Sequence, residues 1–282
     1  MTAFVISVVI SSTVSAQSMK MSLINKLHEE QAKTSSEWTL MLYCGGDEDP
    51  PIIGSQKLID LFKGVSYVSN ENLNVIVLVD YGEAFLGVLK PNEKTGLYDF
   101  VVIENYDEKN MGDYASLRDF IKYCKTNYPA DRYFLQIVGH AFAFYDACPD
   151  FETGDPNKDF DYLTMDEIQR ALEENNGVDI FATTGCLMGN LECAYEFRTC
   201  TDVYISSEEI YKNTMVPFNL LKDLKVIREH HDESTITVAM ELMNELKQLP
   251  FSTISAVRTD KLELVRQAID DFSRFLIEGI NE

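Results

Sequence analysis

Runs of apolar residues alternate with amphipathic segments along most of this chain, beginning near Trp38. The apolar runs are short and rich in Val, Ile, Leu and aromatic residues. A short run that is apolar at consecutive positions is typical of a strand covered on both faces, as in a parallel sheet. The pattern therefore predicts strands at Trp38–Tyr43, Asn74–Asp80, Tyr133–Val138, Val178–Ala182, Val203–Ser206 and Ile254–Val257.

Between these runs, apolar residues recur at the three- and four-residue spacing of amphipathic helices. Leu117 and Ile121 are one such pair. Thr164 and Glu167 form a capping-box pattern, which is typical of the first turn of a helix. The spacing predicts helices at Asp113–Asn127, Thr164–Glu174, Asn190–Cys200, Ser234–Leu249 and Asp260–Ile277.

Alternating strands and helices indicate an α/β fold with a mostly parallel central sheet and helices on both faces. In open sheets of this kind, ligands bind beyond the carboxyl ends of the strands. The residues that directly follow the predicted strands are therefore the first candidates for a functional site. They are Cys44-Gly45-Gly46-Asp47, Tyr81, Gly139-His140, Thr184-Gly185-Cys186 and Ser207-Glu208-Glu209.

The length of 282 residues suits one large domain, which we place at residues 37–282 after an N-terminal extension at residues 1–36. Ala3–Val14 is apolar and Ser-rich, and Val14-Ser15-Ala16 resembles a signal-peptidase cleavage site, although no Lys or Arg precedes the run. The protein is expected to be secreted if this segment is a signal peptide, and cytoplasmic otherwise. The run is too short to span a bilayer, so we do not expect stable membrane insertion.

The chain is strongly acidic, with 24 Lys and Arg against 46 Asp and Glu and a net charge of −22. Nucleic-acid binding requires clustered Lys and Arg, so a nucleic-acid partner is not expected. An acidic surface attracts basic peptides, but it also simply keeps a protein soluble, and net charge alone does not separate the two roles. The oligomeric state is not predicted.

Six cysteines in a chain of this length do not form a disulfide scaffold. There is no C-x-x-C pair, so a cysteine zinc site is not expected. Cys186, Cys193 and Cys200 lie seven residues apart, which would put them near one face of a helix. Free cysteine, however, usually behaves as a small buried apolar residue. We therefore predict no metal at these cysteines.

His140 and Cys186 follow two separate predicted strands, and a glycine precedes each of them. A thiolate can cleave a peptide bond when an imidazole lowers the thiol pKa and later protonates the leaving amine. Cys186 also precedes a predicted helix, whose N-terminal dipole would favour the thiolate. The structural alternative is a buried histidine and a core cysteine. His28 precedes the domain and His230-His231 lie in a charged stretch, so they suit the role less well.

Several segments, in this order along the chain, resemble the clostripain family of cysteine peptidases in the caspase-like clan. The resemblance implies a caspase-like fold and endopeptidase activity after Arg or Lys, through a thioester acyl-enzyme. It implies that Cys186 attacks, that His140 handles the proton, and that the backbone N–H groups of Ala141 and Cys186 hold the oxyanion. Thr184 and Glu208 would line the substrate pocket. The resembling segments are Trp38–Asp47, Met111–Phe120, Asn127–Tyr133, Asp161–Glu167, Cys186–Met188, Glu192–Glu196 and Ser206–Glu208.

The chain departs from the family pattern in two places. Thr184 stands where the family usually has an acidic residue that binds a basic P1 side chain, so we expect an altered P1 preference. Ala141-Phe142-Ala143-Phe144 follow the histidine, where the family usually has glycines. A catalytically weak or inactive homologue that acts as a binding or regulatory module is therefore the alternative. Another α/β hydrolase or a nucleotide-binding protein is disfavoured, because the chain has no G-x-S-x-G, Walker A or G-x-G-x-x-G motif.

No cofactor is expected to be required, although some family members use Ca²⁺. Asp155, Asn157, Asp159 and Asp166 partly match a calcium loop, but Phe160 replaces its essential glycine, so a solvated acidic loop is favoured.

Some family members are activated by a cut between the histidine and the cysteine, and Lys158 is a candidate cut site or an ordinary surface lysine. Family members often run longer than this chain, so we leave open whether it is full length.

Overall fold

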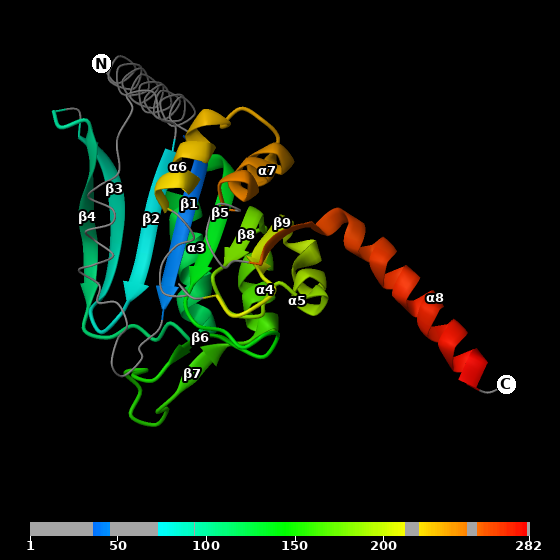
Figure 1. Ribbon diagram of the computed structural model, residues 1–282. Coiled ribbons are helices and arrows are strands. Elements are labelled where there is room, and N and C mark those ends of the chain that lie inside the picture. The colour runs from blue at the N-terminus through cyan, green and yellow to red at the C-terminus, as the bar shows by residue number, and fades with distance from the viewer. Residues whose placement is uncertain (1–35, 46–72, 93, 212–219, 247–252, 281–282) are drawn as a thin grey trace, which may run out of the picture. The chain divides into compact units, whose positions relative to one another are not determined.

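Eight strands form one central sheet in the computed structural model, which describes residues 36–45, 73–92, 94–211, 220–246 and 253–280 (Figure 1). The strand order is β10-β9-β8-β5-β1-β2-β3-β4. The strands are β1 (Ser36–Gly45), β2 (Leu73–Asp80), β3 (Ala84–Asn92), β4 (Leu97–Tyr106), β5 (Ala130–Val138), β8 (Val178–Thr183), β9 (Thr201–Ser207) and β10 (Ile254–Arg258).

The centre of the sheet is parallel, because β1 pairs in parallel with β2 and β5, β5 with β8, and β8 with β9. The flanking pairs β2–β3, β3–β4 and β9–β10 are antiparallel. All the strands predicted from apolar runs are present. The parallel strands β9, β8, β5, β1 and β2 point their carboxyl ends to the same edge of the sheet, which is where the candidate site residues were expected.

Helices cover both faces of the sheet (Figure 1). Side chains alternate along β1, so Leu40 and Leu42 pack into the core that contains α6 and α7 residues, while Met41 and Tyr43 pack into the core that contains α3 and α4 residues. Burial on both faces explains why these strands are apolar at consecutive positions. The helices are α3 (Tyr114–Asn127), α4 (Met165–Glu173), α5 (Leu191–Glu196), α6 (Leu220–Glu229), α7 (Thr235–Leu246) and α8 (Leu262–Ile280).

The capping box predicted at the start of α4 is present. The Thr164 hydroxyl accepts a hydrogen bond from the Glu167 N–H at 3.2 Å, and the Glu167 carboxylate accepts one from the Thr164 N–H at 2.9 Å. Asp113 caps α3 with a single hydrogen bond, which its carboxylate accepts from the Ser116 N–H. The sequence patterns therefore located the first turns of these two helices.

A separate two-stranded sheet, β6 (Ala147–Asp150) and β7 (Asp161–Leu163), interrupts the connection from β5 to α4. Figure 1 shows this hairpin beyond the arrowheads of the parallel strands. The hairpin therefore lies at the same edge of the sheet as the candidate site.

The proposed N-terminal extension, including the candidate signal peptide and His28, lies outside the described residues apart from Ser36. Gly46 and Asp47 also lie outside them. The boundary at residues 36 and 37 stays a prediction. No helix within the described ranges is long and apolar enough to cross a membrane.

Candidate active site

His140 and Cys186 follow neighbouring strands of the central sheet. β5 ends at Val138 and β8 ends at Thr183, and the two strands pair in parallel up to Ile137 opposite Thr183. The structure therefore brings together the two chain segments that carry the predicted pair. Both His140 and Cys186 are half-buried, as a reactive side chain that must meet a substrate requires.

Two hydrogen bonds join these strand ends before the candidate residues. The Thr184 N–H donates to the Ile137 carbonyl oxygen at 3.0 Å, and the Gly139 N–H donates to the Thr184 hydroxyl oxygen at 3.2 Å. Thr184 is fully buried. Its hydroxyl therefore acts as a link between the segment that leads to His140 and the segment that leads to Cys186. A lining role in the substrate pocket stays a prediction.

A third connection lies beyond the candidate residues. The Ala143 N–H donates to the Cys186 carbonyl oxygen at 3.2 Å, and Phe142 forms an isolated parallel bridge with Cys186. Ala141 and Cys186, the predicted oxyanion donors, thus belong to two segments that run side by side. Their role as donors stays a prediction.

Close backbone approach explains the glycine that precedes each candidate residue. A Cβ atom on Gly139 would lie 2.3 Å from the Gly45 carbonyl oxygen, and one on Gly185 would lie 2.4 Å from the Ala141 Cβ. Real Cβ atoms do not come this close to other atoms. Any larger residue would therefore push the segment of His140 or of Cys186 out of place.

Three of the four non-glycine residues with left-handed backbone in the described part of the chain lie around the candidate site, and the fourth, Asn176, lies in the turn after α4. Ala143, Cys148 and Leu187 have φ values of 55°, 48° and 62°. A residue other than glycine in this region costs on the order of 1–3 kcal/mol and persists only where the surroundings enforce it. Such strain tends to cluster at functional sites, so its position agrees with a site built from these segments.

Cys186 differs from the other cysteines, all of which lie in described parts of the chain. Cys186 is half-buried, and its Sγ lies 3.8 Å from the Tyr211 carbonyl oxygen. The other five thiols are buried, and burial raises the pKa of each of them, to about 12 for Cys148, Cys193 and Cys200. A thiol with a raised pKa is a poor nucleophile at neutral pH. Cys186 is therefore the best-placed nucleophile among the cysteines.

The prediction that a helix dipole acts on Cys186 is wrong. Helix α5 begins at Leu191, after Cys186 and a loop, and it contains only six residues. Its N-cap Asn190 already satisfies the first turn, because the Asn190 side chain accepts from the Cys193 N–H at 2.8 Å. The dipole effect falls off within the first turn. The predicted longer helix ends early because Phe197–Thr199 form a 3₁₀ turn.

The end of β9 is attached to the segment that follows Cys186. The Gly189 N–H donates to the Ser207 carbonyl oxygen at 2.7 Å, and the Leu187 N–H donates to the Glu209 carbonyl oxygen at 3.2 Å. Glu208 lies between these two acceptors and is exposed. The structure therefore places Glu208 at the same edge as Cys186. Tyr211 was not among the predicted site residues, because it lies two residues beyond the strand-end residues Ser207-Glu208-Glu209.

The remaining described histidines lie elsewhere. The His231 ring contacts the Glu37 carboxylate, near the amino end of β1 and thus at the opposite edge of the sheet. His230 Nδ1 lies 2.9 Å from a Glu233 carboxylate oxygen, which raises the pKa of His230. Neither histidine is a competing partner for Cys186.

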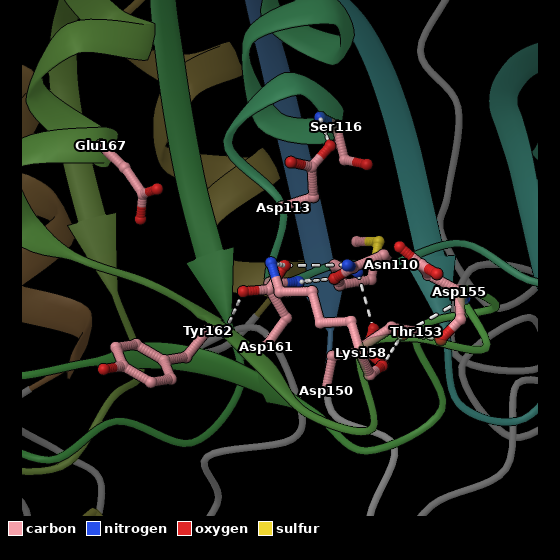
Figure 2. Close-up of polar contacts among 12 residues, drawn as sticks. Asn110, Asp113, Ser116, Asp150, Thr153, Asp155, Lys158, Asp161, Tyr162 and Glu167 are labelled. Atoms are coloured by element: carbon pink, nitrogen blue, oxygen red, sulfur yellow. Dashed lines mark hydrogen bonds and ion pairs between the residues drawn. The ribbon is translucent and has the colours of Figure 1, made fainter.

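Lys158 lies in the loop between β6 and β7, and its ammonium group forms an ion pair with Asp161 (Figure 2). Asn110 also donates to Asp161 at 2.8 Å, and the Thr153 hydroxyl donates to the Lys158 carbonyl oxygen. The hydrogen bond with Asp161 raises the pKa of Lys158. Lys158 is thus half-exposed but held by several contacts. Whether it is a cut site stays a prediction.

The partial calcium loop serves as a turn. The Asp155 carboxylate accepts from the Asn157 backbone N–H at 2.9 Å, and Asp166 lies in the first turn of α4. Within the described ranges, no group of three or more His, Cys, Asp or Glu side chains is arranged to hold a metal ion.

Comparisons with known proteins place this fold and these segments in one family. The sequence model of the Clostripain family, Peptidase C11, matches residues 43–282. Clostripain from Hathewaya histolytica is 33% identical over 211 residues, which are 62% of this chain and 40% of that protein. The chain therefore spans less than half the length of that relative.

Solved structures show the same fold. A secreted C11 cysteine protease from Bacteroides thetaiotaomicron, in complex with an irreversible peptide inhibitor, has a TM-score of 0.66 at 18% identity and covers 83% of this chain and 69% of its own. An inactive zymogen C11 protease from Parabacteroides distasonis has a TM-score of 0.64 at 23% identity, and the match covers 82% of this chain and 64% of that protease. The predicted caspase-like α/β fold is confirmed. The chain belongs to the clostripain family, peptidase family C11.

Proposed function

We propose that this chain is a cysteine endopeptidase in which Cys186 is the nucleophile and His140 is its acid–base partner. The observation that carries the proposal is that the two residues follow adjacent parallel strands, whose ends are joined by the Gly139–Thr184 and Ala143–Cys186 hydrogen bonds. Membership of the clostripain family supports the same chemistry.

In the proposed reaction, His140 takes the proton from the Cys186 thiol as Sγ attacks the carbonyl carbon of the scissile peptide bond. The negative charge that develops on the carbonyl oxygen is held by the backbone N–H groups of Ala141 and Cys186. The intermediate collapses, the C–N bond breaks, and His140 gives its proton to the leaving amine. Water then hydrolyses the thioester, with His140 as the general base, and regenerates the thiol.

The P1 preference is proposed to be shifted away from Arg and Lys. Thr184 is uncharged, and its oxygen already accepts the Gly139 N–H. Burying an Arg or Lys side chain without a charged partner is costly. Glu208 is an acidic side chain at this edge, but it is exposed, where an ion pair contributes about 0–1 kcal/mol. Apolar P1 side chains therefore gain relative to basic ones.

Labelling and turnover with peptidyl electrophiles and substrates that carry Arg, Lys, Leu or Asp at P1 test the proposal. We expect labelling to require Cys186, to fall at least tenfold in His140→Ala because a general base typically contributes 10²–10⁴-fold, and to favour Leu. The other cysteines are internal controls, because their burial predicts slow reaction until the chain is unfolded.

The alternative is an inactive homologue that binds peptides without cleaving them. It is favoured by the replacement of the family's acidic residue with Thr184. If Cys186 reacts no faster than the buried cysteines with every probe, also after proteolytic cutting and with added Ca²⁺, the peptidase proposal is wrong and the binding role replaces it.

A further inference from the structure

Three exposed aromatic rings lie in the short loop that follows His140. Phe142 and Tyr145 are 61% and 59% exposed, and Phe144 is 45% exposed. We call residues 142–145 the aromatic loop. Its rings contact one another, with centroids 6.1 Å apart for Phe142 and Tyr145 and 4.5 Å apart for Phe144 and Tyr145. Clustered exposed apolar side chains commonly mark a binding surface.

The backbone of the aromatic loop is fixed beside the nucleophile. The Ala143 N–H donates to the Cys186 carbonyl oxygen at 3.2 Å, and the Cys193 Sγ lies 3.7 Å from the Ala143 carbonyl oxygen. A turn closes the loop, because the Tyr145 N–H donates to the Phe142 carbonyl oxygen at 3.1 Å. A preorganised apolar surface binds with little loss of conformational entropy. The rings are therefore held in place rather than displayed on a free segment.

The aromatic loop lies next to His140, and this position determines which half of a bound peptide the loop contacts. In the proposed reaction the histidine protonates the leaving amine, so the residues after the scissile bond lie on the histidine side of the nucleophile. The aromatic loop begins two residues after His140 and runs beside Cys186. It also carries no charged side chain in a chain whose net charge is −22.

From these observations we infer that the aromatic loop is a substrate subsite, which binds an apolar or aromatic side chain in the leaving-group half of the peptide, at P1′ or P2′. This inference rests on the proposed peptidase function and extends it. The aromatic rings of Phe142 and Tyr145 supply the contact area, and Ala143 anchors the loop to the nucleophile segment. Substrates with apolar residues after the scissile bond are therefore cleaved preferentially.

The test uses two matched series of internally quenched peptides that share one unprimed sequence and carry Phe or Ser at P1′ or P2′. We expect the full chain to cleave the Phe peptides with a kcat/KM about tenfold higher, since differences in apolar contact typically give 10- to 200-fold discrimination. Phe142→Ser and Tyr145→Ser should reduce this preference to less than threefold.

A control keeps loss of folding apart from loss of the subsite. Phe160 is also an exposed ring in an aromatic cluster, with its centroid 4.8 Å from that of Phe151, but it lies in the β6–β7 loop and not in the aromatic loop. Phe160→Ser should keep the wild-type preference. The preference is a ratio of two rates measured on the same variant, so a general change in activity cancels, and a peptidyl electrophile that ends at P1 reports whether Cys186 still reacts in Phe142→Ser and Tyr145→Ser.

The outcomes separate the two proposals. A wild-type chain that is labelled at Cys186 but cleaves the Phe and Ser peptides equally overturns the subsite and leaves the peptidase intact. Equal loss of preference in Phe160→Ser also overturns it, because the effect would not be specific to the loop. No labelling of wild type with any probe overturns the peptidase and the subsite together.

Discussion

The Thr184 hydroxyl oxygen accepts a hydrogen bond from the Gly139 N–H at 3.2 Å and so ties the segment of the predicted nucleophile to that of its predicted partner. The oxygen is buried, and Gly139 itself cannot carry a larger side chain beside the Gly45 carbonyl oxygen. One hydroxyl group therefore holds two neighbouring strand ends in register. It also belongs to the residue for which the family resemblance predicts an acid.

Thr184→Val tests the structural part of this role. Valine has nearly the same shape but no acceptor, so the buried Gly139 N–H loses its partner. We expect the free energy of unfolding to fall by about 1–3 kcal/mol. Urea unfolding followed by far-UV circular dichroism measures the change. Thr184→Ser retains the acceptor and is the control, and equal midpoints for the Val and Ser variants would contradict the prediction.

Thr184→Asp tests whether residue 184 determines the preference for the P1 side chain. An aspartate oxygen can still accept the Gly139 N–H, and its charge offers a partner for a basic P1 side chain. We expect the ratio of kcat/KM for Arg over Leu peptides to rise at least tenfold. Thr184→Asn has a similar size without the charge and should leave the ratio near its wild-type value. An unchanged ratio in the Asp variant would place Thr184 outside the P1 pocket.

Alkaline pH should destabilise the chain through its buried thiols. Burial raises the pKa of Cys148, Cys193 and Cys200 to about 12, whereas an unfolded thiol has a pKa of about 8.5. Above about pH 8.5 the unfolded chain loses these protons first, so the free energy of unfolding declines as the pH rises toward the folded pKa. Urea midpoints between pH 7.5 and 10.5 measure the decline. Cys200→Ala should make the decline shallower, and a flat profile in the wild type would rule out this contribution.

The Lys158–Asp161 ion pair should protect the β6–β7 loop from proteolysis. Asp161→Asn removes the charge partner of the half-exposed Lys158. The lost ion pair stabilises the folded loop by about 1 kcal/mol at most. We therefore expect cleavage after Lys158 by a lysine-specific protease to become about fivefold faster. Gel-resolved limited digestion measures the rate. Asp159→Asn changes a neighbouring exposed carboxylate and should leave the rate unchanged.

The same digestion tests Lys158 as an activation site. If a cut there activates the chain, the rate of Cys186 labelling should rise as the uncut chain disappears. If the labelling rate stays constant through the digestion, Lys158 is a surface lysine and activation does not occur at this position.

The central strands could be predicted because burial on both faces leaves a continuous apolar run, as in Val75–Val79. Strands β3 and β4 were missed. In β3, Ala84–Leu89 are buried and apolar around Gly87, and in β4 Phe100–Ile103 are apolar at consecutive positions, so both strands carry an apolar run that the prediction left out. Helix α6 was missed as well, in a segment with Lys and Glu among its apolar residues. Continuous apolar runs thus identify the parallel centre of the sheet, and the same signal is present in β3 and in part of β4.

Only part of the candidate site could be predicted, because an apolar run shows where a strand ends but not which strand lies beside it. Each residue could be assigned to a strand end, but the sequence alone does not say that β5 lies beside β8; that neighbour relationship depends on the packing of the whole sheet. Phe142 and Phe144 stood out in the sequence because the family pattern has glycines there, whereas Tyr145 and its ring contacts did not. The buried link through Thr184 was also missed, because a pattern of residue types does not indicate which backbone N–H a hydroxyl will meet.

The strand order of the sheet has a consequence for how the protein is made. β5 takes its place between β1, which precedes it in the chain, and β8, which is synthesised well after it. When His140 has just emerged from the ribosome, Cys186 has not yet emerged. Strand β8, which places Cys186 at the same edge of the sheet as His140, has not emerged either. The two segments therefore lie side by side only after β8 has emerged and joined the sheet, so a prematurely terminated chain that stops before β8 contains His140 without the segment of its predicted partner.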